Sequence, residues 1–496
     1  MEIRETMVVG RCVDICQIAP TTQSAAAFAL VSAIVASTTA TAAAPASAPA
    51  PASAPASASA SASASAPASA PASASAPVPA SASASASGRS VFPGRVRPTA
   101  AEAPVVACSF VSPVCVHAPS VVAGDAVLRT LAASERFFLG IAALGYPTPL
   151  SDGERGGDAR YDVYLSFDLT TPLTVPDEIA TGSGFDQTSA FTVLPPPLVA
   201  AGCVFDSALA RALTHALVLR FDAGAENASI AMAQSYLASS LVDCYVEEDQ
   251  AIDDFQRDPE RSFARGEPDQ MTGSFLFPRF LDDHYGTGAP GAVLFGLLSV
   301  AAQRTASNSL SFSNEPDLFD ALRSNSRARE KPFEDLLLDF AVARAFVGSR
   351  SDGGHLSDVA KYGSFGRARF EWSIPWSSLP RRLAPMRPIE PLGATYLWLD
   401  LQGAPEDGEF GFVVDWELGV LFHWALVKID ASGAEVGRVQ IGGINGATHA
   451  ERTLIGFKGL SGILVVGTNT GSIDRSHPYD PDESNAPRGY TMFLVK

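Results

Sequence analysis

The sequence has little positive charge and few of the side chains that build metal centres. Lysine and arginine number 35 against 53 aspartates and glutamates, which gives a formal net charge of −18. A surface with this excess of carboxylates repels phosphate groups, so nucleic acid and anionic lipid are excluded as general partners. Only 7 histidines occur in 496 residues. The chain also lacks a G-x-S-x-G elbow and a phosphate-binding P-loop, so serine-hydrolase and nucleotide chemistry have no starting point.

Cysteine is scarce as well. The chain has 6 cysteines. Cys12 and Cys16 precede the apolar N-terminal region, and the other four follow it: Cys108, Cys115, Cys203 and Cys244. An even number of cysteines in an exported chain favours disulfides, and four cysteines allow three connectivities. Proximity along the chain favours the pairs 108–115 and 203–244. Neither spacing fits a zinc ribbon.

Long apolar runs are confined to one place. Residues 24–45 (SAAAFALVSAIVASTTATAAAP) combine small apolar side chains with Ala-x-Ala-like cleavage sites, which is typical of a secretory signal peptide. Segment 1–45 is therefore expected to be a signal peptide, with a retained N-terminal anchor as the alternative. No other stretch reaches about 18 uninterrupted apolar residues, so a membrane contact is expected only through this segment.

The next segment, 46–100, is dominated by an Ala, Ser and Pro repeat. Large apolar side chains are almost absent there, so nothing offsets the entropy lost on ordering, and proline interrupts any helix. The composition predicts a disordered, semi-extended linker that tethers the folded part of the chain.

Two different patterns follow the linker. Helical periodicity predicts helices over 125–144, 206–220, 229–241, 275–284, 291–303, 318–324 and 332–347, with one strand over 161–167. Short alternating runs predict strands over 367–376, 395–401, 409–417, 421–430, 435–441, 452–457, 463–468 and 490–495. We therefore expect an α+β protein, with a mainly helical domain over 101–365 and an antiparallel β-sandwich over 366–496.

The helical part contains the stretch that bears on function. Residues 206–243 read DSALARALTHALVLRFDAGAENASIAMAQSYLASSLVD. This stretch resembles the active-site helices of exported bacterial metallopeptidases of the gluzincin type, in which an HExxH helix is followed by a helix that supplies a glutamate. Segments 144–153, 161–165, 275–286 and 333–348 also resemble parts of that family. The likeness covers residues 120–496 and implies a metallopeptidase-like helical domain before a β-sandwich.

The resemblance also implies that the metal site has been lost. Zinc requires two histidines one helical turn apart and a third ligand, and a glutamate beside the first histidine activates the bound water. Alignment on the F-D pair after the helix places Arg211 and Ala212 at the first histidine and the glutamate, and His215 at the second histidine. The glutamate of the second helix falls near Ala233 or Gln234. Arg211 opposes a dication and a single imidazole gives no chelate, so we expect no catalytic residue, metal or cofactor.

Three functions remain open from the sequence. The first is an inactive metallopeptidase-like protein, secreted or in the periplasm or cell envelope of a bacterium, that binds an unidentified protein or glycan. The second is an active hydrolase that uses His215 with carboxylates such as Asp222, Glu226 or Asp243. The third is a structural envelope protein whose linker spaces the folded part from a surface.

Three weaker patterns are assigned to structure. The sequence GTGAPG at 286–291 matches a dinucleotide fingerprint, but it follows a helix, so we expect a loop that caps the next helix. The acidic residues Asp474, Asp480, Asp482 and Glu483 lack EF-hand spacing, so a solvated loop is expected instead of a calcium site. All five tryptophans, Trp372, Trp376, Trp398, Trp416 and Trp424, lie in the expected sandwich. Most should be core, although one or two exposed near a loop would form a platform for carbohydrate.

Overall fold

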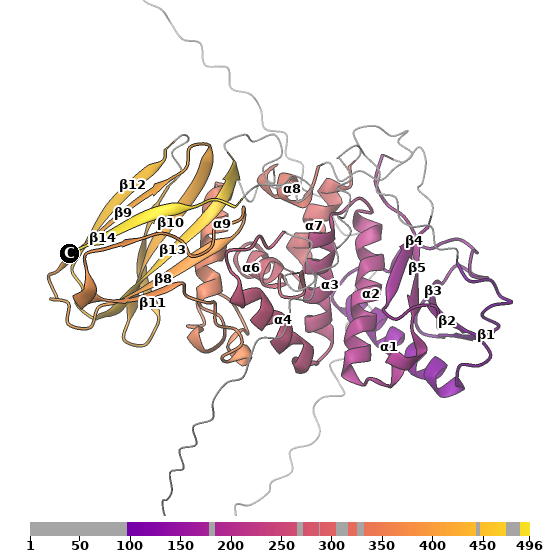
Figure 1. The fold of residues 1–496 in the computed structure, drawn as a ribbon. Coiled ribbons are helices and arrows are strands. Elements are labelled where there is room, and N and C mark those ends of the chain that lie inside the picture. The colour runs from indigo at the N-terminus through magenta and orange to yellow at the C-terminus, as the bar shows by residue number, and fades with distance from the viewer. Residues whose placement is uncertain are drawn as a thin grey trace, which may run out of the picture. The chain divides into compact units, whose positions relative to one another are not determined.

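The computed structural model describes residues 97–177, 184–264, 271–286, 288–303, 316–324, 332–442, 447–472 and 487–496 (Figure 1). They belong to one unit, Ala82–Lys496, and combine α-helices with three β-sheets, so the α+β class is confirmed. The predicted signal segment, most of the predicted linker and the acidic residues of 474–483 lie outside the described residues. Among the described helices, none has the length and apolar character needed to cross a membrane.

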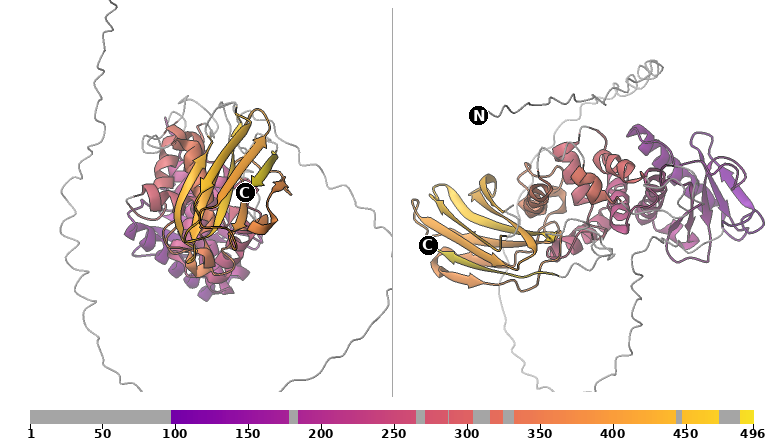
Figure 2. Two further views of the ribbon diagram at one scale, coloured as in Figure 1. Left: turned by 90° about the vertical axis from the view of Figure 1, so that its left-hand side faces the viewer. Right: turned by 90° about the horizontal axis from the view of Figure 1, so that it is seen from above.

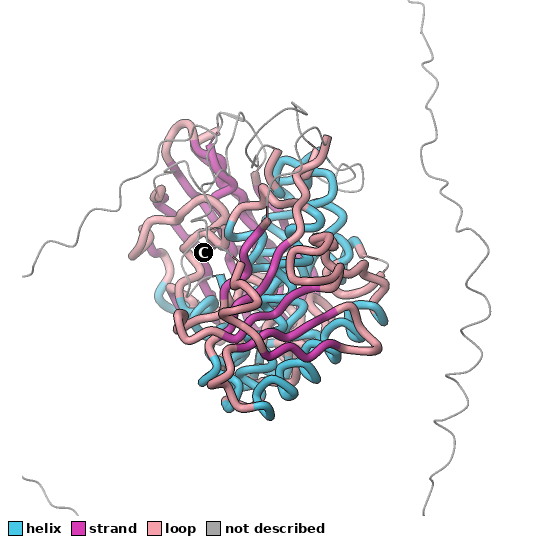
Figure 3. Tube along the Cα trace, turned by 90° about the vertical axis from the view of Figure 1, so that its right-hand side faces the viewer, coloured by secondary structure: helices cyan, strands magenta, loops and turns pink. Residues whose placement is uncertain are grey.

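A five-stranded sheet opens the described chain. Its strands are β1 (Val105–Cys108), β2 (Val114–Ala118), β3 (Tyr161–Leu165), β4 (Leu173–Pro176) and β5 (Ala190–Leu194), in the order β1-β2-β3-β5-β4. The three central strands run parallel, and the edge strands pair antiparallel with their neighbours. Figure 3 shows these strands in magenta in front of the helices. Only β3 was predicted, so the expected mainly helical pattern is wrong for this part of the chain.

The missed strands have a physical explanation. Each of β1, β2, β4 and β5 has only four or five residues. Every residue of β2, β3 and β5 is buried, because the central strands are covered on both faces. Strands of this kind have no polar face, so the alternation that reveals a strand in a sequence is lost.

Helices α1 (Gly124–Ala143) and α2 (Cys203–Phe221) contact strands of this sheet, and α3 (Asn227–Leu241) packs against α2. The later helices are α4 (Tyr245–Arg257), α6 (Leu276–Tyr285), α7 (Ala292–Ala301), α8 (Leu318–Ser324) and α9 (Phe333–Ala345). The predicted helices are confirmed to within a few residues, but α4 was missed because its sequence is mostly polar. Asp206 lies in the first turn of α2 and pairs with Arg129 at 2.9 Å.

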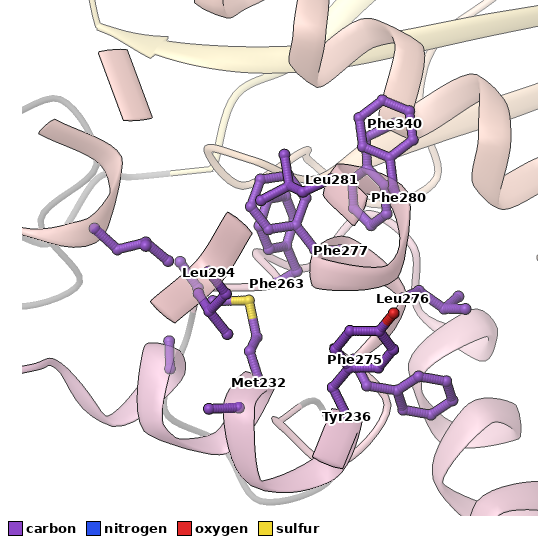
Figure 4. Packing of buried hydrophobic residues seen from close by; sticks show 14 of the residues in the cluster. Met232, Tyr236, Phe263, Phe275, Leu276, Phe277, Phe280, Leu281, Leu294 and Phe340 are labelled. Carbon is purple, nitrogen blue, oxygen red and sulfur yellow. The ribbon is translucent and has the colours of Figure 1, made fainter. Parts of the chain in front are cut away.

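The helices share an apolar core rich in phenylalanine, which Figure 4 shows from close by. The rings of Phe263 and Phe277 have centroids 4.7 Å apart, and Phe277 lies 5.0 Å from Phe340 of α9. Met232 and Tyr236 of α3 belong to the same buried cluster. One face of α3 is therefore held by this core.

The C-terminal strands form two further sheets, in the orders β11-β10-β13-β8-β6 and β12-β9-β14-β7. Their bounds are β6 (Trp372–Pro375), β7 (Arg381–Leu383), β8 (Ala394–Asp400), β9 (Glu409–Trp416), β10 (Val420–Asp430), β11 (Glu435–Ile441), β12 (His449–Ile455), β13 (Leu460–Ser472) and β14 (Tyr490–Val495). Residues of both sheets, including Phe412 and Trp424, share one buried core, as in a β-sandwich (Figure 2). All eight predicted strands are present, and the three-residue β7 was missed.

The outer face of the first of these sheets is also covered. Ala425 and Val427 of β10 and Leu464 of β13 lie in one buried cluster with Leu338 and Val342 of α9. β10 contacts α9 on one face and the sandwich core on the other, and for this reason it has a buried residue at nearly every position.

None of the five tryptophans is exposed. Trp376, Trp416 and Trp424 are buried, and Trp372 and Trp398 are partly buried. The indole N–H of Trp416 donates to the carbonyl oxygen of Val420 at 3.2 Å. The expectation that most tryptophans form the core is confirmed, and a platform of exposed tryptophan for carbohydrate is wrong.

Candidate functional site

The α2–α3 helix pair is closed by a disulfide at the end where α2 begins. Cys203 is the first residue of α2, and Cys244 lies between α3 and α4; their Cα atoms are 5.4 Å apart. The second disulfide, Cys108–Cys115, closes the turn between β1 and β2. Both pairings are the predicted ones. The first disulfide holds the first turns of α2 beside the last turns of α3, where the resemblance places a metal site.

Arg211 lies on the side of α2 that faces α3 and α4. It lines a small cavity together with Ser207 of α2, Ser235 of α3 and Glu248 of α4. The cavity has a volume of about 10 Å³, roughly the space that one water molecule needs. The position assigned to the first zinc histidine is thus occupied by a guanidinium in a space too small for a substrate.

Glu248 supplies the negative charge of this cavity. Its Oε2 accepts a hydrogen bond from the Tyr362 hydroxyl at 3.1 Å and lies 3.5 Å from Nζ of Lys361. Burial raises the pKa of Glu248, and the charge of Lys361 opposes that shift. The carboxylate is therefore held by structural partners on the segment after α9.

His215 lies one turn after Arg211. The residue is partly exposed, but its Nε2 atom is buried and has no hydrogen-bond partner within the described ranges. Burial lowers the pKa of the imidazole to about 4, and no charged neighbour contributes to this shift. The imidazole is neutral near pH 7, and among the described residues no carboxylate pairs with it.

The other positions that the resemblance assigns to a metal site point elsewhere. Ala212 packs in the apolar cluster between α2 and the N-terminal sheet, and its carbonyl oxygen accepts a hydrogen bond from Thr174 Oγ1 at 2.7 Å. Ala233 lies in the core of the helices with 1% of its surface exposed, whereas Gln234 is partly exposed. The structure brings Arg211 and the second helix together, but it gives neither alanine a chemical role.

The donor set does not fit zinc. A zinc centre needs three or four converging nitrogen, sulfur or oxygen ligands. Across the described ranges, only one group of three potential ligands comes together, and it consists of Cys108, Cys115 and Asp158. Both of these cysteines are consumed in a disulfide, so they offer no thiolate. His215 belongs to no such group.

The carboxylates considered for a rearranged hydrolase do not surround His215 either. Asp222 is 3% exposed, and burial raises its pKa well above the ordinary value, with Glu226 and Asp186 adding to the shift. Asp243 is exposed at the surface. No pattern in the sequence pointed to Asp186, which the loop before β5 brings close to Asp222. The acidic groups form their own buried cluster after α2, separate from the imidazole.

A charged cluster that the sequence analysis missed lies on the sheet face opposite α1 and α2. Arg97 pairs with Asp152 (Nη1–Oδ2, 2.7 Å), with Asp162 and with Asp177 (Nη2–Oδ2, 3.1 Å). Its guanidinium carbon lies 4.7 Å from the ring centroid of Phe191. Because Arg97 falls within 46–100, the prediction of a disordered linker is wrong for its last residues.

The surroundings of Asp162 show how this cluster is held. Nε2 of His117 lies 2.8 Å from Oδ1 of Asp162, and the His117 ring stacks on Tyr164. Burial raises the pKa of Asp152 to about 6; Arg97 opposes this, and Asp162 adds to it. The glycine-rich run at 153–157 is the sequence feature that could have indicated this cluster. A Cβ at Gly156 would collide with the Asp162 carboxylate. All four charged groups are largely enclosed, so the cluster anchors the chain and offers no open site.

The GTGAPG segment behaves as predicted. Gly286 follows α6, and Gly291 precedes α7 with a left-handed backbone (φ 81°) that favours glycine. Thr287 lies outside the described residues. The N–H groups of Gly291 and Val293 donate to the carboxylate of Asp282, so the start of α7 is satisfied by the protein itself.

Comparison with known proteins gives no family. No family model matches the chain, and no curated protein matches it. A pre-peptidase C-terminal domain of a collagenase from Bacillus anthracis matches with 10% identity and a TM-score of 0.17, over 26% of this chain and 98% of that domain. CorA, a surface-associated copper-binding protein of Methylomicrobium album BG8, matches with 8% identity and a TM-score of 0.18, over 25% and 98%. Likenesses this weak support no argument about this chain.

Proposed function

We propose that this chain is an exported, metallopeptidase-like protein without catalytic activity, which acts by binding a protein or a glycan in the cell envelope or outside the cell. The observation that carries the proposal is the position of Arg211. Its guanidinium lines the cavity between α2, α3 and α4, where a peptidase of the resembled family needs an open metal site.

Three physical arguments support the absence of catalysis. A permanent cation repels a dication at short range, and arginine does not lose its proton in proteins. The cavity of about 10 Å³ leaves no room for a scissile bond. His215 alone offers one nitrogen, which binds zinc weakly without a chelating partner.

Export is supported by the chemistry of the cysteines and by composition. Two disulfides suit an oxidising compartment. The apolar segment 24–45 has the character of a signal peptide, and the following Ala/Ser/Pro repeat suits a spacer between a surface and the folded part.

The test is the metal content and peptidase activity of the purified full chain. We expect substoichiometric zinc by elemental analysis after dialysis against metal-containing buffer. We also expect no hydrolysis of a peptide library, with or without added zinc, and no difference between the wild type and His215→Ala. Stoichiometric metal, or a chelator-sensitive activity that His215→Ala removes, would overturn the proposal.

A further inference from the structure

A second cavity lies in the sandwich, away from the helix pair. It has a volume of about 280 Å³ and opens at the edge where β11 and β12 lie. Its floor is apolar and is formed by Trp416 at the end of β9, Phe422 of β10 and Ile441 at the end of β11. Small-molecule pockets span roughly 300–1,000 Å³, so this cavity has the size of a small ligand site.

The cavity exists because edge strand β12 has unusual side chains on its inner face. Ala450 pairs with Val414 of β9, and Arg452 pairs with Phe412. Val414 and Phe412 are fully buried in the sandwich core, and directly paired residues of antiparallel strands point to the same face. Ala450 and Arg452 therefore lie on the inner face of β12, but at the edge of the sandwich: Ala450 is partly buried and Arg452 is exposed, so neither side chain fills the core there.

Arg452 brings a permanent positive charge to this cavity. Its Nη1 donates a long hydrogen bond of 3.5 Å to the carbonyl oxygen of Glu451, and among the described residues Arg452 makes no ion pair. Two acidic residues lie close by: Asp415 accepts a hydrogen bond from His449 at 2.8 Å, and Glu451 lines the cavity beside Arg452. Arg452 therefore lies at the polar side of a cavity whose other walls are apolar, where its donors can reach a ligand.

We propose that this cavity binds a small carboxylate with an apolar body, such as a short fatty acid or an arylalkanoate. The apolar body packs against Trp416 and Phe422, and the carboxylate accepts two parallel hydrogen bonds from the planar guanidinium of Arg452. The guanidinium of Arg452 disfavours a cationic head group beside it, and the apolar side chains give no partner to a freely hydrated anion. This inference does not depend on the loss of catalysis in the α2–α3 pair.

The experiment compares octanoate with 1-octanol, which has the same chain and no charge. Both are titrated into the full chain, and affinity is measured by calorimetry and by ligand-observed NMR. We expect octanoate to bind about tenfold more tightly than octanol, which corresponds to about 1.4 kcal/mol for one partly exposed charged contact. Arg452→Gln should abolish this preference and leave the affinity for octanol unchanged.

Two further variants keep the test decisive. Ala450→Leu fills the cavity and should abolish binding of both probes. Arg382→Gln removes an exposed arginine from β7, at the opposite edge of the same sheet, and should change neither affinity. Circular dichroism and the Tm verify that each variant folds. The proposal is overturned if octanoate does not bind, if octanol binds as tightly, or if Arg452→Gln and Arg382→Gln behave alike.

Discussion

Nε2 of His355 lies 2.7 Å from Oε2 of Glu435, so the segment after α9 is joined to the first residue of β11. The other ring nitrogen, Nδ1, lies 2.9 Å from Oδ1 of Asp352. The imidazole also stacks on Phe346, with ring centroids 3.8 Å apart. Arg438 of β11 donates to the second oxygen of Glu435 at 2.6 Å. One histidine therefore lies at the centre of the polar contacts between the helices and the sandwich.

The first prediction concerns this contact and pH. Burial alone would raise the pKa of Glu435, but hydrogen bonds from His355 and Arg438 hold it below its ordinary value of 4.5. A carboxylate with a lowered folded-state pKa stabilises the protein above its unfolded pKa and loses that effect as the pH falls through the folded value. Glu435→Gln should thus lower the free energy of unfolding by about 1–3 kcal/mol at pH 7.

The difference between wild type and Glu435→Gln should shrink below about pH 4. Urea unfolding at pH 7, 5, 4 and 3 measures this change. Glu409→Gln serves as the control, because Glu409 is exposed at the start of β9. A pH-independent difference would contradict the assignment of the charged form to Glu435.

A second prediction concerns the two disulfides. Cys203–Cys244 closes a longer stretch of chain than Cys108–Cys115, with sequence separations of 41 and 7. Loop-closure entropy assigns about 4 kcal/mol to the first and about 2 kcal/mol to the second. Replacing each pair with serines should therefore lower the Tm more for 203–244, and calorimetry under identical conditions would reveal a reversed order.

A third prediction tests the anchoring of the chain by Arg97. Arg97→Gln leaves Asp152, Asp162 and Asp177 without their shared cation, and breaking a buried ion pair costs about 3–5 kcal/mol. The cost should decrease as the pH falls from 7 to 4, because the uncompensated carboxylates take up protons in the folded state. Chemical denaturation at these pH values measures it.

The control for Arg97 is Arg136→Gln. Arg136 pairs with Asp206 at 3.1 Å, but its side chain is 57% exposed. A surface ion pair of this kind contributes at most about 1 kcal/mol. Equal losses in the two variants would show that the enclosed position of Arg97 does not matter.

A fourth prediction reverses the substitution that the proposed function depends on. Arg211→His removes the cation and places a second imidazole one turn before His215, on the side of α2 that also faces Glu248. Two histidines at this spacing chelate one metal ion, so zinc affinity should rise at least about tenfold over wild type. Competition with a chromogenic chelator measures the affinity.

Two variants complete that experiment. Adding His215→Ala to Arg211→His should return the zinc affinity to the wild-type level. Arg220→His adds a histidine near the other end of α2, where Arg220 donates to the carbonyl oxygen of Thr148, and should have no effect. A similar gain from Arg220→His would indicate nonspecific binding and would count against the position assigned to Arg211.

Much of the fold followed from local patterns. The 3.6-residue period located α1 and α9 to within a few residues, alternation located β9 and β11, and turn residues at its ends located β10. The pairing Cys203–Cys244 was predictable because each cysteine flanks one helix of a hairpin. Composition, periodicity and turn residues are local properties, which need no contact with a distant segment.

The predictions that were wrong concern features that depend on contacts between distant segments. Strands β2 and β5 were not predicted, because layers on both faces bury them and remove the alternation of polar and apolar residues. Arg97 was assigned to a disordered linker, because the three carboxylates that pair with it come from residues 55 to 80 positions later. The sequence by itself determined that residues 206–243 contain a single histidine, and it favoured the two cysteine pairings that the structure has. Only the tertiary structure decided that Arg211 lines a cavity of about 10 Å³ and Arg452 one of about 280 Å³, because burial and charge pairing depend on which distant elements pack together.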